Sequence, residues 1–319
     1  MTAANPSRAI SRTTFSPRPE TQSGVTLVEL MVVLLILAAL AGAAVLSTEH
    51  IVDQTRDDQT RRTLTSIEQA VIGRPGLIDA SGQHWIQGFV ADMGRLPRAF
   101  GDAPVLPEDP RVQLQELWVP PMDPGAAFAI ESPPGDLGVQ LAAGWRGPYL
   151  QLPYGVAELR DAYGNGFVLR RADGMTAENS DPIAEIVALG SDGEAGGVGY
   201  ATDLAVTLES ALVPARYHGD VPVRVSGVPA GEWVILRIYG PVDGSAGTVA
   251  QVGPLLETGG IVTALFADVS IGRRVLRAYR VAASTVVAAD DPIGGAVAGR
   301  VTPLTVVQGG VDEIQLEFD

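Results

Sequence analysis

Two aspartates flank a glycine-rich loop whose composition suits a bound cation. Residues 190–199 read GSDGEAGGVG, and Asp203 follows shortly after them. Calcium takes roughly six to eight oxygen ligands from carboxylates, carbonyls and water, and glycine lets a loop fold back and present its carbonyls. Asp192 and Asp203 are therefore candidate calcium ligands, with Glu194 as a weaker one. A solvated turn that contains acids is the alternative interpretation of the same residues.

A single carboxylate, Glu29, lies near the start of a long apolar segment. Residues 25–46 read VTLVELMVVLLILAALAGAAVL, about the length that crosses a ~30 Å hydrocarbon core as a helix. A carboxylate in such a helix costs roughly 2.5–3.5 kcal/mol, so we expect it to have a partner. A secretory signal peptide is the alternative, but this apolar run is long for one and carries an acid near its beginning, for which a generic signal anchor has no use.

The residues before the apolar segment are polar and basic. Residues 1–23 contain Arg8, Arg12 and Arg18 against one acid, Glu20. Positive charge on one flank of a span marks the cytoplasmic side. We therefore expect the leader in the cytoplasm and the rest of the chain outside it.

The string Ser23-Gly24-Val25-Thr26-Leu27-Val28-Glu29-Leu30 resembles the prepilin peptidase site of type IV pilins and pseudopilins. The resemblance implies cleavage between Gly24 and Val25 by prepilin peptidase, which removes a leader of residues 1–24, and N-methylation of Val25. It also implies that Glu29 neutralises the amino terminus of a neighbouring subunit in the filament. Valine replaces the more usual phenylalanine or methionine at the first mature position.

The apolar segment continues into an amphipathic one. Ile51, Val52, Leu64, Ile67 and Val71 recur at three- and four-residue steps among charged and amide residues, which predicts a helix. We expect one helix from about Leu27 to Ile72, ended by Gly73-Arg74-Pro75-Gly76. Residues 25–72 would then form a transmembrane and assembly helix.

The middle of the chain contains short glycine- and proline-rich strings. GWRGPYL at residues 144–150, DAYGNGFVL at 161–169 and ALGSDG at 188–193 occur in this order. They are similar to the major pseudopilin of type II secretion systems, although Ala162, Tyr163 and Gly166 depart from its turn motif. The resemblance implies a Ca²⁺ site formed by the Leu189 carbonyl and the Asp192 and Asp203 side chains. It assigns residues 73–212 to a pilin-like head.

From about residue 213 the pattern changes to alternating strands. Residues 221–225, 233–239 and 314–318 alternate or are rich in β-formers, with glycine turns between such runs, which predicts a β-sandwich over residues 213–319. Residues 266–279 and 306–310 resemble carboxypeptidase-regulatory and surface-stalk modules, which are usually noncatalytic. The expected fold class is α+β: a long amino-terminal helix packed on a β head, with a carboxy-terminal β-sandwich.

Composition excludes several classes of function. The net charge of −15 would repel nucleic acid. There is no cysteine for disulfides or thiolate metal sites. His50, His84 and His218 are far apart, and no nucleophile elbow, P-loop or dinucleotide motif is present. We therefore expect that the protein is not an enzyme.

These features favour a subunit of a pseudopilus in a type II secretion-like system. Its expected partners are copies of itself, minor pseudopilins, prepilin peptidase and the inner-membrane assembly platform. It would be a single-pass inner-membrane protein with its globular part in the periplasm. A type IV pilin or minor pilin that displays the carboxy-terminal domain as an adhesin is the alternative. A membrane-anchored periplasmic binding protein that never polymerises is a third possibility, which the Gly24–Glu29 pattern disfavours.

Overall fold

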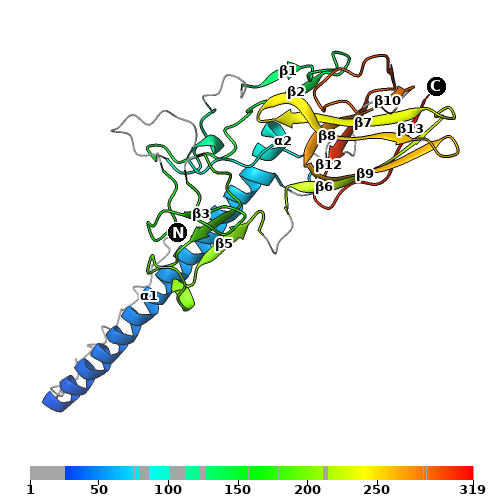
Figure 1. The fold of residues 1–319 in the computed structure, drawn as a ribbon. Coiled ribbons are helices and arrows are strands. Elements are labelled where there is room, and N and C mark those ends of the chain that lie inside the picture. The colour runs from blue at the N-terminus through cyan, green and yellow to red at the C-terminus, as the bar shows by residue number, and fades with distance from the viewer. Residues whose placement is uncertain are drawn as a thin grey trace, which may run out of the picture. The chain divides into compact units, whose positions relative to one another are not determined.

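The computed structural model has a mixed α+β fold (Figure 1). It divides into two compact units, residues 1–52 and residues 53–319. The described residues are 26–74, 76–78, 86–100, 112–121, 127–156, 158–178, 180–210, 215–282, 284 and 286–318, without the side chains of residues 43–49.

Helix α1 spans Leu27–Ile72, as the sequence predicts. Its large apolar side chains from Leu27 to Leu40 are exposed, whereas Leu64, Ile67 and Val71 are buried. The helix ends at Gly73, whose positive φ suits only glycine and whose Cβ position lies 2.5 Å from the Gln87 carbonyl oxygen. No helix in the described part of the chain is long and apolar enough to cross a membrane, so the predicted span is not confirmed.

The second half of α1 packs on a small head. This head contains helix α2 (Phe89–Met93), a 3-10 helix (Gln115–Leu117) and an antiparallel sheet in the order β3-β4-β5. Strands β3 (Val168–Arg170), β4 (Glu185–Ala188) and β5 (Leu204–Thr207) are short, and a second 3-10 helix (Gly199–Ala201) precedes β5. One hydrophobic core joins the helix to the sheet; it includes Leu64, Ile67, Phe89, Phe167, Leu169 and Ile186.

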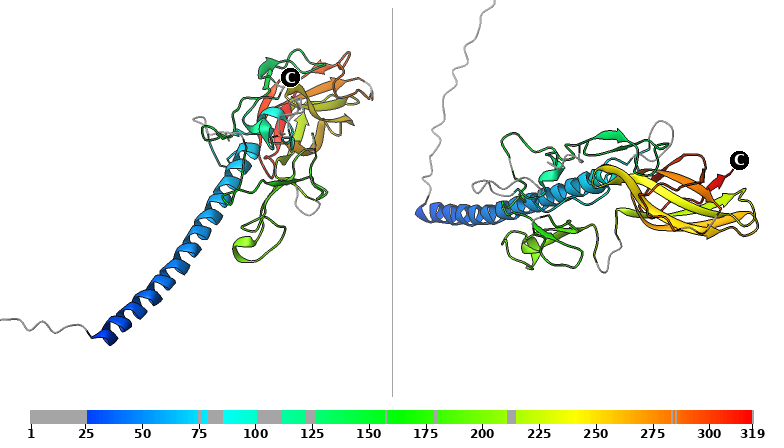
Figure 2. Two further views of the ribbon diagram at one scale, coloured as in Figure 1. Left: turned by 90° about the vertical axis from the view of Figure 1, so that its left-hand side faces the viewer. Right: turned by 45° about the horizontal axis from the view of Figure 1, so that its top comes forward.

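The carboxy-terminal part is a two-sheet β structure (Figure 2). One sheet has the order β11-β10-β7-β8, with β12 also paired to β10, and the other has the order β13-β6-β9. Val223 of β6 and Leu236 of β7 lie in one buried core, so the two sheets face each other. The strands are β6 (His218–Ser226), β7 (Trp233–Val242), β8 (Ser245–Leu256), β9 (Ile261–Ser270), β10 (Gly272–Val281), β11 (Val297–Ala298), β12 (Thr302–Val306) and β13 (Ile314–Glu317).

A third layer covers the β7 side of this structure. Strands β1 (Ala129–Glu131) and β2 (Leu141–Ala143) pair antiparallel, and Val139 and Leu141 share a core with Ile235 and Tyr239. These residues fall in the range that the sequence assigns to the head, yet they pack on the carboxy-terminal sheet. The division into a head over residues 73–212 and a β-sandwich over residues 213–319 stays a prediction.

A buried polar network holds this third layer on the carboxy-terminal sheet. Asp136 accepts hydrogen bonds from the Arg277 guanidinium at 2.7 Å, from the Tyr279 hydroxyl and from the Gly138 amide at 2.9 Å. Burial raises the pKa of Asp136, but these hydrogen bonds and the Arg277 charge outweigh it and hold the pKa below its usual value. The carboxylate is thus kept ionised as the partner of Arg277.

Helix α2 joins the head to the carboxy-terminal sheets. The Gly244 amide donates to the Met93 carbonyl at 2.9 Å, and the fully buried Arg274 donates to the Ala91 carbonyl at 3.3 Å. Gly94 has a positive φ, and a side chain there would strike the Pro241 carbonyl. Close backbone contact, rather than a linker alone, holds these two parts of the 53–319 unit together.

Candidate functional site

The first candidate site lies at the amino-terminal end of α1. Gly24 and Val25, the predicted cleavage residues, lie outside the described residues. Glu29 lies in the first turn of α1 and is exposed. Its backbone amide donates to the Thr26 hydroxyl at 3.2 Å, which is how an N-cap residue satisfies a helix terminus.

Thr26 is a residue that the sequence analysis did not single out. The spacing Thr26-x-x-Glu29 is the signature of a capping box and could have identified it. A carboxylate in the first turn also interacts favourably with the positive end of the helix dipole. Glu29 therefore sits where it stabilises the helix start and is still open to a second partner.

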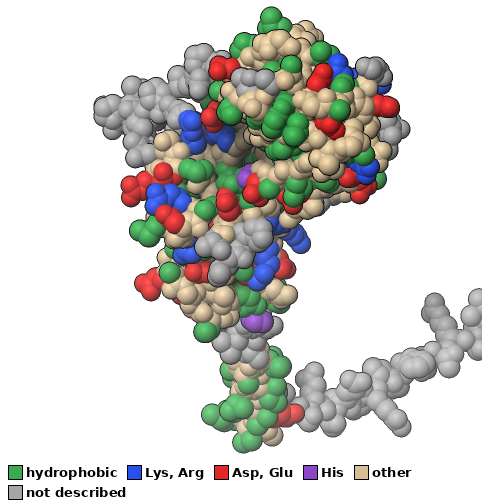
Figure 3. Space-filling model, turned by 45° about the vertical axis from the view of Figure 1, so that its right-hand side comes forward, with side chains coloured by type: hydrophobic (Ala, Val, Ile, Leu, Met, Phe, Trp, Pro, Cys, Tyr) green, Lys and Arg blue, Asp and Glu red, His purple; other side chains and the backbone are tan. Residues whose placement is uncertain are grey.

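The side chains around Glu29 are apolar on every face of the helix. Leu27, Val28, Leu30, Met31 and Val32 are each more than half exposed. On the face drawn in Figure 3, hydrophobic side chains cover this end of α1, with acidic atoms beside them. A helix that is hydrophobic all round is expected to be buried in a membrane or in an assembly.

The second candidate site is the loop between β4 and β5. The Ser191 amide donates to the Tyr200 carbonyl at 2.9 Å and closes the loop. Gly190 has a positive φ of 67°, and its Cβ position lies 2.7 Å from the Ala201 backbone. The two ends of the loop are thus in close backbone contact, an approach that requires glycine.

The two predicted acidic ligands differ in their surroundings. One oxygen of Asp203, Oδ2, accepts from the Gly196 amide at 3.1 Å, while Oδ1 is buried without a hydrogen-bond partner. Asp192 is exposed, and its Oδ1 accepts from the Glu194 amide at 3.2 Å. Leu189 is half-buried just after β4. Both carboxylates therefore belong to one closed loop.

The donor set of this loop suits a weakly held hard cation. Among the described residues, no three or more His, Cys, Asp or Glu side chains gather where they could hold a metal. A site here would consist of two carboxylates and backbone carbonyls, which are ligands that Ca²⁺ accepts. A buried oxygen without a partner costs free energy, and a cation at Asp203 Oδ1 would remove that cost. The residues present thus fit calcium.

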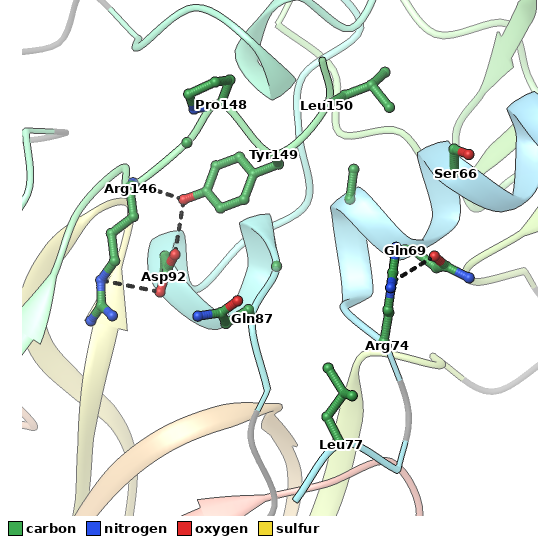
Figure 4. A pocket seen from close by; sticks show the side chains of 13 residues that line it. Ser66, Gln69, Arg74, Leu77, Gln87, Asp92, Arg146, Pro148, Tyr149 and Leu150 are labelled. Atoms are coloured by element: carbon green, nitrogen blue, oxygen red, sulfur yellow. Dashed lines mark hydrogen bonds and ion pairs between the residues drawn. The ribbon is translucent and has the colours of Figure 1, made fainter. Parts of the chain in front are cut away.

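A pocket of about 590 Å³ lies where the end of α1 meets α2 and residues 146–150 (Figure 4). Inside it the Tyr149 hydroxyl donates to Asp92 at 3.0 Å and accepts from the Arg146 amide at 2.9 Å. Burial raises the pKa of Asp92, although the Arg146 charge and the Tyr149 hydrogen bond oppose this rise. Burial and the nearby Asp92 charge also raise the pKa of Tyr149. The tyrosine therefore stays protonated as a donor, and the group acts as a structural link between α2 and residue 146.

Comparison with known families matches residues 21–45 to the prokaryotic N-terminal methylation motif. Neither a curated protein nor a solved structure matches the chain. The matched residues include Gly24, Val25, Thr26 and Glu29. The motif marks the chain as type IV pilin-like, a substrate of prepilin peptidase that assembles into filaments.

Proposed function

We propose that this protein is a structural subunit of a pseudopilus in a type II secretion-like system. The observation that carries the proposal is the methylation motif at residues 21–45, which leads into a 46-residue helix with exposed apolar side chains at its start. Its partners would be further copies of the chain, minor pseudopilins, prepilin peptidase and the inner-membrane assembly platform. It acts by polymerising and performs no catalysis.

The start of α1 is the part that polymerises. Before assembly the apolar side chains lie in the inner membrane, with the globular part in the periplasm. In the filament they are covered by the same segment of neighbouring subunits. Glu29 then pairs with the positive amino terminus of a neighbour, because a lone charge in an apolar core is expensive.

A type IV pilin or minor pilin is the second candidate. The observation that favours it is the carboxy-terminal part, whose described residues form eight strands, β6 to β13. The major pseudopilins, which the middle region resembles, do not have such a module. In a pilus this module would be displayed outside the cell as an adhesin.

Deletion of the gene in its native host separates the two candidates. If the chain is a pseudopilin, we expect the culture medium to lose a set of folded proteins, which accumulate in the periplasm, while surface pili remain. Proteomics of medium and periplasm with electron microscopy of whole cells makes the measurement. Loss of pili with unchanged secretion would favour the pilin, and complementation with the intact gene is the control.

We further propose that the loop after β4 binds one Ca²⁺. The Leu189 carbonyl and the Asp192 and Asp203 carboxylates would hold it, supported by the buried, unpartnered Asp203 Oδ1. A site with only two carboxylates is expected to be weak, with a Kd on the order of 10⁻⁴–10⁻³ M as in extracellular modules. It would fill outside the cytoplasm and stay empty before export.

Calcium should stabilise the mature, detergent-solubilised protein. At ten times the Kd, linkage gives about 1.4 kcal/mol of added stability, seen as a higher Tm in calcium than in chelator. Asp203→Ala and Asp192→Ala should abolish this rise, whereas Asp173→Ala, at an exposed head carboxylate, should keep it. Magnesium should substitute poorly, because it demands tighter octahedral geometry. A wild-type Tm that is the same in calcium and in chelator would rule the site out.

A further inference from the structure

A tight turn at residues 161–166 lies between α1 and the glycine-rich loop and contacts both. Asp161 organises the turn: its Oδ1 accepts from the Tyr163 amide at 3.0 Å and from the Asn165 amide at 2.7 Å. The Asp161 amide donates in turn to the Asn165 carbonyl at 2.9 Å. Asp161 is only 6% exposed. These hydrogen bonds close the turn on itself.

One side of the turn holds α1. The Ala162 amide donates to the Thr60 hydroxyl at 3.1 Å, and Thr60 is 1% exposed. The Tyr163 hydroxyl donates to the Asp53 carbonyl at 3.1 Å. The Arg56 guanidinium lies over the Tyr163 ring, 5.8 Å from its centre. Residues 53–60, about two turns of the helix, are thus held by one hydrogen-bonded turn.

The other side of the turn contacts the loop through the Asn165 side chain. The Asn165 Nδ2 group donates to the Gly190 carbonyl at 3.0 Å. Its Oδ1 lies 3.2 Å from the Cβ position of Gly193, so a side chain at residue 193 would crowd it. Because the Ser191 amide is bonded to the Tyr200 carbonyl, both polar groups of the peptide between residues 190 and 191 are fixed. That peptide follows Leu189 and precedes Asp192.

We propose that Asn165 couples the glycine-rich loop to the assembly helix: it positions the start of the loop, and the turn passes the order of the loop on to residues 53–60 of α1. As a regulatory device this rests on the calcium site proposed above. Ordering of the loop by the cation strengthens the hold of the turn on α1, and a firmly held helix favours the binding of calcium. Coupling between two sites is reciprocal in this way. In a calcium-rich compartment, calcium binding in the head thereby holds the polymerising helix more firmly.

The test is hydrogen–deuterium exchange of the mature, detergent-solubilised protein, with calcium and with chelator. In the wild type, calcium should slow exchange both in residues 189–203 and in residues 53–60. Asn165→Ala should weaken calcium binding about fivefold, the factor that one ordinary hydrogen bond corresponds to. In this variant, saturating calcium should still slow exchange in the loop but should not slow exchange in residues 53–60. Gln151→Ala, at an exposed amide of the same head, should behave as wild type.

A second variant covers the case that Asn165→Ala does not fold. Tyr163→Phe keeps the ring and removes only the donor to the Asp53 carbonyl, so calcium should protect the loop and protect residues 53–60 less than in the wild type. If both variants keep calcium-dependent protection of residues 53–60, the coupling is wrong.

The chelator arm separates this proposal from the calcium site. If the wild type binds no calcium, the calcium site is wrong. The link itself is then supported if Asn165→Ala speeds exchange of both the loop and residues 53–60 in chelator, and it is overturned if exchange there equals that of the wild type.

Discussion

Glu29→Leu is expected to leave the protein in the membrane and to exclude it from filaments. Removing a carboxylate from an apolar helix lowers the cost of insertion by roughly 2.5–3.5 kcal/mol, so membrane fractionation should find the variant at least at the wild-type level. In the filament the same change leaves the amino terminus of a neighbour without its counter-ion. Breaking a buried pair from one side costs about 3–5 kcal/mol, enough to reduce incorporation more than a hundredfold when the variant competes with the wild type.

The effect of Glu29 on helix capping must be separated from its effect on pairing. Thr26→Val is the matched control, because it removes the hydroxyl that accepts from the Glu29 amide and leaves the carboxylate in place. Loss of an N-cap costs about 1 kcal/mol, so this variant should still assemble. Differently tagged variant and wild-type chains, expressed together, are counted in sheared filaments. Normal co-assembly of Glu29→Leu would contradict charge pairing.

Replacement of Gly24 with a bulky residue is expected to block maturation completely. A peptidase needs an unhindered backbone at the scissile bond, and glycine supplies it. The precursor would keep its 24-residue leader, and Val25 would never become an amino terminus. Glu29 of a neighbouring subunit would then have no positive amino terminus to pair with. Immunoblots of Gly24→Leu should show only the larger precursor, and filaments should be absent.

The control for this prediction is Val25→Phe. Phenylalanine is more usual than valine at the first mature position of the prepilin sites that this string resembles, so Val25→Phe should be cut and assembled normally. Efficient cleavage of Gly24→Leu at the same bond would show that the glycine is not required.

The parts of the fold that follow from local patterns could be predicted from the sequence. The three- and four-residue recurrence of apolar residues through Ile67 and Val71 predicts α1 to its last residue, Ile72, because helix periodicity is a local property. The change to β structure after residue 213 follows from alternation in the same way, and strands such as Trp233–Val242 lie where expected. Glu29 could be identified because a charge in an apolar run is conspicuous by itself.

Contacts between distant residues could not be predicted. Asp136 and Arg277 lie 141 residues apart, and nothing in the string around Asp136 indicates that it packs on the carboxy-terminal sheet. Asn165 belongs to a glycine turn that local chemistry predicts, but its bond to Gly190 depends on how β3 pairs with β4. The unpartnered oxygen of Asp203 likewise follows from burial and has no local signal.

The intact mass of the protein extracted from native membranes shows whether the chain is processed as a type IV pilin-like subunit before it polymerises. We expect a mature chain that begins at Val25 and carries one additional methyl group on its amino terminus, with residues 1–24 absent. Fragmentation of the amino-terminal peptide places that methyl group. A mature chain that begins at any other residue, or one that retains the leader, would show that the chain is not processed as a type IV pilin-like subunit.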